Sequence, residues 1–264
     1  MPSSRGVFYG WWVTVAFSVM VFVSAGVRHA VGPFLKPMVA DLGVDRGAFS
    51  LVIALGLFLY GAFMPWVGGL TDRFGARLVT AVGSVLLAAS LALTSLCQNL
   101  WQLALVYGGL ASLGLACTGP VVANAVVTRW FVRRRGTAVS VLGSAAMTGM
   151  SLLVPVVAWL IVVYGWRTAY VVLGAAVLLG MLPLCVFVVR DSPEAMGLAP
   201  DGDAAGSATV AAYTRTPAST ALRTVAFWQL GGSFFTCGFS MSLVSAHGVP
   251  SSPTTATRRS SPRG

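Results

Sequence analysis

The chain alternates long uncharged apolar runs with short polar segments. The runs Val7–Val27, Ser50–Thr71, Gly136–Trp166 and Thr168–Val189 contain no charged side chain, and neither do the 51 residues of Leu78–Thr128. A membrane-spanning helix needs about 20 apolar residues. Each of the first four runs therefore predicts one span, and the longest run predicts two.

Polar segments predict where these spans meet. Leu96–Asn99 divides the longest run, and Tyr164–Arg167 separates the fifth span from the sixth. Arg28–Gly47 connects the first two spans, and its Gly32-Pro33 and Lys36-Pro37 pairs predict that no helix continues through it. Asp45, at the end of this segment, is expected to cap the second span.

Beyond the sixth span the composition changes. Residues 191–223 are rich in Ala, Ser, Thr, Pro and Asp and predict a cytoplasmic linker. Residues 224–247 predict a seventh span, and residues 248–264 have the composition of a disordered tail. We therefore predict an all-α, polytopic membrane protein, with a six-helix bundle over residues 1–190 and a seventh transmembrane helix. The abrupt loss of apolar pattern after Pro250 suggests a frameshift, which the downstream nucleotide sequence would test.

Composition supports the membrane class and bears on the net charge. Only 9 % of the residues are charged and 56 % are hydrophobic, whereas a soluble domain is about 25 % charged. The net charge of +10 lies in short arginine clusters between apolar runs, without the basic face that binds nucleic acid. With the N-terminus inside, inner segments carry ten of the 17 Lys and Arg residues and outer segments four. This asymmetry predicts a plasma (inner) membrane protein, surrounded by lipid, with a cytoplasmic N-terminus.

Other classes find less support. The first run could be a cleaved signal peptide with Ser24-Ala25-Gly26 as its cleavage site, but its length and its Trp, Phe and Val content favour a retained span. The four cysteines lie in or beside apolar runs and lack metal-ligand spacing. The seven acidic residues lie in loops or in the linker, and no catalytic constellation is present. We predict no enzyme activity, no metal and no cofactor.

A charged turn between the second and third spans carries the most specific signal. It reads Gly68-Gly69-Leu70-Thr71-Asp72-Arg73-Phe74-Gly75-Ala76-Arg77. Its two adjacent glycines are expected to allow close helix packing. Asp72 is expected to bind backbone N–H groups or pair with a cation, and Gly75 to supply a positive φ. Arg73 and Arg77 are placed at the lipid headgroups. A generic charged turn is the alternative interpretation.

This turn resembles the signature of the major facilitator superfamily. Supporting segments are Gly10-Trp11-Trp12, Arg129-Trp130-Phe131 with Arg133–Gly136, Gly165-Trp166-Arg167 and Arg190–Glu194. Together they resemble the monocarboxylate-porter and oxalate/formate-antiporter branch over about residues 6–249. The resemblance implies two six-helix halves, of which this chain supplies one with the seventh helix. It also implies that Gly68, Asp72, Arg73, Gly75 and Arg77 latch the halves and set the balance between inward and outward states.

The resemblance also directs attention to the end of the first span. In this branch a basic residue near the outer end of span one takes part in anion and proton handling, and that position falls on His29, next to Arg28. A cation there attracts a carboxylate, and His titrates near physiological pH. A helix-end Arg that reaches the interface is the alternative. Asn124 is expected to line a cavity or to bond across helices. No arginine lies within Gly108–Thr128, where drug exporters of the superfamily carry one.

The sequence thus predicts a secondary transporter for small organic anions such as monocarboxylates. Coupling to protons or anion exchange is expected, and the chain is interpreted as a truncated half. The alternative is a non-transporting membrane fragment or an interaction partner of other membrane proteins.

Overall fold

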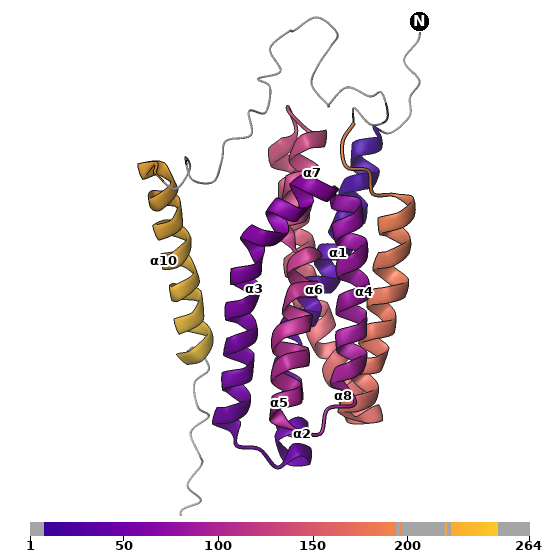
Figure 1. Ribbon diagram of the computed structural model, residues 1–264, viewed down its shortest axis with the longest axis vertical. Helices are drawn as coiled ribbons and strands as arrows, with labels where there is room; N and C mark the ends of the chain where they lie inside the picture. The colour runs from indigo at the N-terminus through magenta and orange to yellow at the C-terminus, as the bar shows by residue number, and fades with distance from the viewer. Residues whose placement is uncertain (1–7, 194–195, 197–219, 221–222, 248–264) are drawn as a thin grey trace, which may run out of the picture. The chain divides into compact units, whose positions relative to one another are not determined.

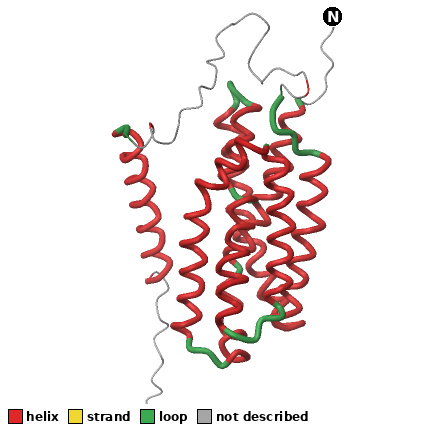
Figure 2. The backbone as a smooth tube through the Cα atoms, viewed as in Figure 1, coloured by secondary structure: helices red, strands yellow, loops and turns green. Residues whose placement is uncertain are grey.

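The computed structural model describes residues 8–193, 196, 220 and 223–247, which form helices joined by short loops, with no strand among them (Figure 2). The helices are α1 (Tyr9–His29), α2 (Val31–Leu42), α3 (Arg46–Phe74), α4 (Ala76–Thr94), α5 (Leu100–Leu103), the π-helix η1 (Ala104–Ala111), α6 (Ser112–Cys117), α7 (Pro120–Trp130), α8 (Arg135–Phe187) and α10 (Val225–His247). Figure 1 shows α1 to α8 as a bundle in which the long helices lie nearly parallel, with the short helix α2 at its lower end.

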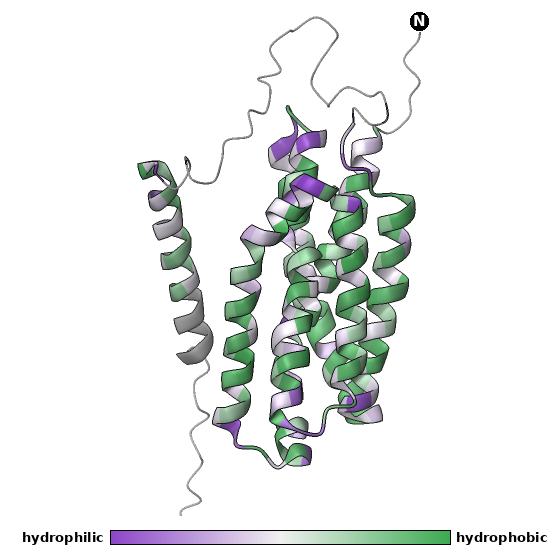
Figure 3. Cartoon of the chain, in the orientation of Figure 1, coloured by the Kyte–Doolittle hydropathy of each residue, from purple (hydrophilic) through white to green (hydrophobic). Residues whose placement is uncertain are grey.

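Apolar residues fill the middle of these rods, and polar residues gather at the two ends of the bundle (Figure 3). Among the described residues, five helical stretches are long and apolar enough to cross a membrane: 9–42, 46–74, 76–94, 100–130 and 135–187. Backbone groups in lipid must bond within their own segment, which a continuous helix achieves. The chain is therefore an all-α, polytopic membrane protein.

The longest stretch, α8, turns back on itself. Its 53 residues would extend about 80 Å as one straight helix, whereas the hydrocarbon core is about 30 Å thick. Gly165 breaks the helix with φ 81° and ψ 163°. The limb before Gly165 packs on α1, where Gly149 faces the Phe22 backbone, and the limb after it packs on α4, where a Cβ at Gly174 would lie 3.0 Å from the Ala88 carbonyl. The predicted break between the fifth and sixth spans is confirmed.

The other predicted junctions also appear. Residues 95–99 separate α4 from α5, and the Asp45 carboxylate caps α3 by accepting the Gly47 N–H at 2.7 Å. The helix that begins at Leu100 passes through the π-helical turns of η1 and bends at Gly119-Pro120 before α7. A π-helical segment widens the backbone and often marks a functional region.

The prediction of an interrupted helix between the first two spans was wrong, because α2 forms there. Pro33 occupies the first turn of α2, where a backbone N–H has no intrahelical partner. Pro37 lies inside the helix and removes one hydrogen bond. Phe34 and Met38 are both buried against the bundle, and this burial outweighs the lost bond.

Helix α10 belongs to a second unit, residues 206–264, apart from the bundle unit of residues 1–205. It covers the region predicted as a seventh span. Most of the predicted linker and the whole predicted tail, residues 248–264, lie outside the described residues.

Candidate functional site

The end of the bundle where α3 meets α4 is rich in arginine, and we call it the arginine-rich end. Asp72, in the last turn of α3, pairs with Arg129 of α7 through an Oδ1–Nη2 distance of 2.7 Å. Gly75 alone separates α3 from α4 and has φ 86° and ψ 153°. Residues that carry a Cβ rarely adopt a positive φ, so glycine suits this one-residue turn. Both roles match the predictions made for Asp72 and Gly75.

Asp191, which follows α8, caps the N-terminus of α4. Its Oδ1 accepts the backbone N–H of Arg77 at 2.8 Å. The residue at the usual capping position is Gly75, which has no side chain to offer. A Cβ on Gly75 would lie 2.6 Å from Asp191 Oδ2. The glycine therefore both makes the turn and leaves room for the carboxylate, whose charge favours a helix N-terminus.

The Arg77 guanidinium strengthens the same junction. Its Nη2 donates to the Val186 carbonyl at 2.6 Å, at the last turn of α8. Lysine or arginine hydrogen bonds satisfy carbonyls that have no partner at a helix C-terminus. Arg77 thus joins the start of α4 to the end of α8 through its backbone and its side chain.

Aromatic side chains complete the arginine-rich end. The Tyr9 hydroxyl donates to the Val188 carbonyl at 2.9 Å, and the Trp130 indole N–H donates to the Arg190 carbonyl at 3.2 Å. The Trp11 ring meets the Phe131 ring edge-on with centroids 5.0 Å apart. These contacts tie the start of α1, the end of α7 and the residues after α8 into one cluster.

Gly68 and Arg73, two residues of the predicted motif, take no part in this network. No described residue has an atom within 4 Å of a Cβ placed on Gly68 or on its neighbour Gly69. The close helix packing expected at these two glycines is therefore not found among the described residues and stays a prediction. Arg73 is exposed, and its guanidinium carbon lies over the ring of its neighbour Phe74, 5.4 Å from the ring centroid.

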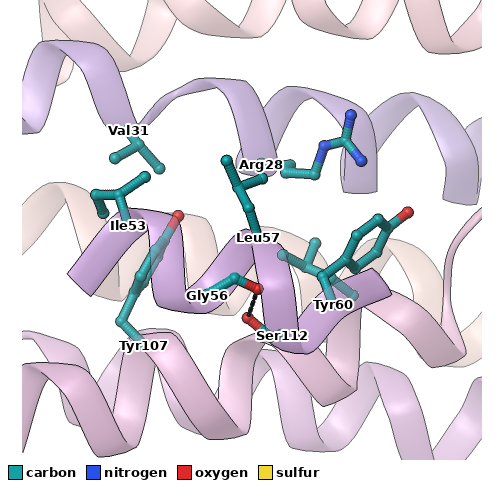
Figure 4. A pocket seen from close by; sticks show the side chains of 9 residues that line it. Arg28, Val31, Ile53, Gly56, Leu57, Tyr60, Tyr107 and Ser112 are labelled. Carbon is teal, nitrogen blue, oxygen red and sulfur yellow. Dashed lines mark hydrogen bonds between the residues drawn. The ribbon is translucent and has the colours of Figure 1, made fainter. Parts of the chain in front are cut away.

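Arg28 lies at the opposite end of the bundle and lines a pocket. The pocket encloses about 30 Å³ between α1, α3 and η1 (Figure 4). Its walls are Arg28, Val31, Ile53, Gly56, Leu57, Tyr60, Tyr107, Ser112 and Leu115. Arg28 is the one charged residue among them, and its guanidinium carbon lies 5.0 Å from the centroid of the Tyr60 ring. Such a cation–π contact holds the guanidinium without neutralising it.

At the floor of the pocket, the backbone of α3 lies close to the backbones of η1 and α6. The Ser112 hydroxyl donates to the Gly56 carbonyl at 2.8 Å (Figure 4). Gly56 also lies opposite Gly108 of η1, whose Cα would be 3.5 Å from a Cβ at Gly56. Tyr107, in the π-helix, turns its ring toward the same space. Sequence reasoning did not single out Tyr60 or Tyr107, because a tyrosine inside an apolar run follows no recognisable pattern.

The structure places His29 differently from Arg28. His29 Nδ1 lies 2.9 Å from the Ala25 carbonyl of its own helix, and His29 is not part of the pocket wall. The two neighbouring candidates, predicted as a pair, therefore do not converge on one space.

Asn124 lies in α7 and has a buried side-chain oxygen. Neither Asn124 Oδ1 nor Ser18 Oγ of α1 has a hydrogen-bond partner among the described residues. The contact between Trp11 and Phe131 sets the register of α1 on α7. Ser18 follows Trp11 by seven residues and Asn124 precedes Phe131 by seven, which is about two helical turns on each side. Both orphan oxygens therefore lie at the same depth on facing helices.

The described residues contain no group of three or more His, Cys, Asp or Glu side chains that could hold a metal ion. The site is thus built from hydrogen bonds, ion pairs and one pocket with a cation.

A family model described as Major Facilitator Superfamily matches residues 17–257. The chain belongs to the major facilitator superfamily. This is a family of transporters rather than of enzymes, and the matching region includes every helix of the bundle from the middle of α1 onward.

Curated relatives point the same way. The MFS-type transporter YcxA of Bacillus subtilis, itself uncharacterised, is 28 % identical over 91 % of this chain and 57 % of its own length. Monocarboxylate transporter 11 of Mus musculus is 31 % identical over 64 % of this chain and 38 % of its own length. The oxalate:formate antiporter of Oxalobacter formigenes is 24 % identical over 91 % of this chain and 55 % of its own length. The chain thus spans 57 % or less of each of these relatives.

Proposed function

We propose that this superfamily member serves the secondary transport of small organic anions such as monocarboxylates. It lies in the plasma membrane with its N-terminus in the cytoplasm, and transport is coupled to protons or proceeds by exchange. The observation that carries the proposal is Arg28, a cation in a pocket whose other walls are apolar, aromatic or uncharged. An ionisable group in such surroundings is a strong indication of function.

The pocket suits one carboxylate group. It has no acidic residue in its wall, and the ion pairs found among the described residues leave Arg28 out. Its volume of about 30 Å³ exceeds the roughly 10–15 Å³ of cavity that one water molecule needs. The head of an anion enters, and the rest of the molecule extends beyond the pocket. The guanidinium then binds the head by charge-assisted hydrogen bonds.

The printed names of two relatives support this class of substrate. One is a monocarboxylate transporter and another an oxalate:formate antiporter. Both names refer to small carboxylates, which match a pocket with a single guanidinium.

His29 and Asn124 are assigned secondary roles in the proposal. The His29 Nδ1 lies 2.9 Å from the Ala25 carbonyl, and His29 is assigned a part in substrate handling next to Arg28. Asn124 and Ser18 supply hydrogen-bonding oxygens deeper in the bundle. A polar group of the transported molecule would satisfy these oxygens, since a buried polar atom without a partner is costly.

The motif at the arginine-rich end is proposed to act as the conformational switch. Asp72 binds Arg129 of α7. Arg77 binds Val186 in the last turn of α8 and Asp191 beyond it, and Gly75 makes the turn between α3 and α4. Breaking and remaking these contacts would let the bundle change shape during transport. Gly68 and Arg73 belong to the motif by sequence and would serve states other than the one described.

Exchange in proteoliposomes tests the proposed function. The 264-residue chain is reconstituted, and counterflow of radiolabelled lactate, formate and oxalate is measured against protein-free liposomes. Saturable uptake that unlabelled carboxylates inhibit, and that choline does not, is expected. Specific carboxylate binding without uptake would favour the alternative, a non-transporting membrane protein. If the chain shows no carboxylate binding and no uptake, the proposal is contradicted.

A further inference from the structure

Asp41 fastens α2 to the second limb of α8 at the end of the bundle that carries Arg28. Its Oδ2 accepts the Trp166 indole N–H at 3.2 Å and lies 3.0 Å from Arg167 Nη2. The Arg167 guanidinium also lies over the Trp166 ring, 4.7 Å from the centroid. One carboxylate oxygen therefore holds two consecutive side chains, which follow directly on the break at Gly165. We call Asp41, Trp166 and Arg167 the clasp.

A column of aromatic rings connects the clasp to the Arg28 pocket. The Trp166 ring meets Tyr170 edge-on at 6.3 Å, and Tyr170 stacks on Phe34 of α2 with centroids 4.0 Å apart and planes 21° apart. On its other side Tyr170 meets Tyr107 edge-on at 6.3 Å. Tyr107 is itself a wall of the pocket. Packed rings transmit position because a close-packed interior has little room to adjust.

The start of α2 is also part of the pocket. Val31, its first residue, lines the same space as Arg28. Only Ala30 separates α1 from α2. A displacement of α2 away from α8 that includes its first turn would move Val31 and open the wall beside Arg28.

We propose that Asp41 is a positioning residue for the Arg28 pocket: it holds α2 against Trp166 and Arg167, and α2 in turn closes the pocket wall at Val31. The substrate role of the pocket rests on the proposed function. The mechanical link between Asp41 and Val31 does not, because it follows from the contacts alone.

Four substitutions separate the parts of the clasp. Asp41→Ala removes both interactions, whereas Asp41→Asn keeps an oxygen for the Trp166 N–H and loses the ion pair. Trp166→Phe removes the N–H and keeps a ring on Tyr170. Asp41→Glu preserves the carboxylate and serves as the conservative variant. We expect the contact between α2 and α8 to loosen most in Asp41→Ala and less in Asp41→Asn and Trp166→Phe. Asp41→Glu should stay close to the parent.

The test measures the exposure of position 31 by thiol chemistry. The four native cysteines are replaced by serine, and Val31→Cys is introduced into the full chain in lipid nanodiscs. The rate of reaction with a hydrophilic methanethiosulfonate reagent is then followed with Asp41 present and with Asp41→Ala. A matched control carries Val188→Cys, which is also partly buried but lies at the arginine-rich end.

The expected result is a rate at position 31 that rises about five-fold or more in Asp41→Ala and returns to the parent value in Asp41→Glu, with the rate at position 188 unchanged. An unchanged rate at position 31 would overturn the proposal. Equal increases at both positions would do so as well, since they would show general loosening of the bundle. If Asp41→Ala does not fold, Asp41→Asn and Trp166→Phe provide the comparison. No anion enters the assay, so its outcome is independent of whether the pocket binds carboxylates.

Discussion

Asp191 Oδ1 accepts the backbone N–H of Arg77 at 2.8 Å across 114 residues of sequence. The first turn of α4 thus receives its cap from the segment that follows α8. Helix caps usually come from the residue next to the helix, but here that residue is Gly75. The α3–α4 turn and the end of α8 are therefore fixed to each other.

This relationship predicts the effect of removing the Asp191 carboxylate. Asp191→Ala leaves the N-terminus of α4 without its acceptor, and loss of a helix cap costs about 0.5–2 kcal/mol. We expect a lower thermal unfolding midpoint in detergent. Asp191→Asn retains an oxygen acceptor and should lose less. Equal losses in both variants would show that charge alone matters at this position.

Glycine substitutions distinguish the turn from the rest of the motif. Gly75→Ala forces a Cβ onto a backbone with φ 86° and against the Asp191 carboxylate. We expect a loss of about 1–3 kcal/mol, as for strained backbone positions in general. Gly68→Ala is the matched control, because a Cβ there meets nothing within 4 Å. Its unfolding midpoint should equal or exceed that of the parent, and a loss as large as that of Gly75→Ala would contradict the account.

The ion pair between Asp72 and Arg129 should contribute little to stability. Side-chain exposures of 57 % for Asp72 and 33 % for Arg129 place it at the surface, where such pairs couple by about 0.2–1 kcal/mol. A double-mutant cycle with Asp72→Asn and Arg129→Gln measures this coupling energy from unfolding midpoints. The coupling should shrink in high salt. A coupling above about 3 kcal/mol would indicate a buried interaction instead.

Cysteine labelling tests the proposed orientation in the membrane. In a cysteine-free background, Arg46→Cys lies at the start of α3 and Arg133→Cys between α7 and α8, both exposed. With the N-terminus inside, an impermeant maleimide should label position 46 in right-side-out vesicles and position 133 only after permeabilisation. The reverse pattern would place the arginine-rich end outside.

The sequence predicted the ends of most helices because their signals are local. Charges and glycines mark the breaks at Gly75 and Gly165, polar residues mark the break at residues 95–99, and Asp45 caps α3 as expected. The rule that proline interrupts a helix failed at α2, since the burial of Phe34 and Met38 compensates for it.

The contacts within the sites were less predictable because they join distant segments. Nothing near Arg77 indicates that Asp191 will cap its helix, and nothing near Arg28 indicates Tyr60 or Tyr107 as neighbours. Arg28 and His29 are adjacent in sequence, yet successive helix positions point about 100° apart. Only one of them reaches the pocket.

Carboxylate binding at Arg28 tests the central claim most directly. Equilibrium binding of radiolabelled lactate is measured on the purified chain, alongside Arg28→Gln and the control Lys36→Gln, which removes the same charge from an exposed site on α2. Hydrogen bonds to a charged group contribute about 1.5–3 kcal/mol, so Arg28→Gln should weaken binding about 10- to 100-fold while Lys36→Gln leaves it unchanged. Lactate binding of equal strength in Arg28→Gln and the parent would contradict the account.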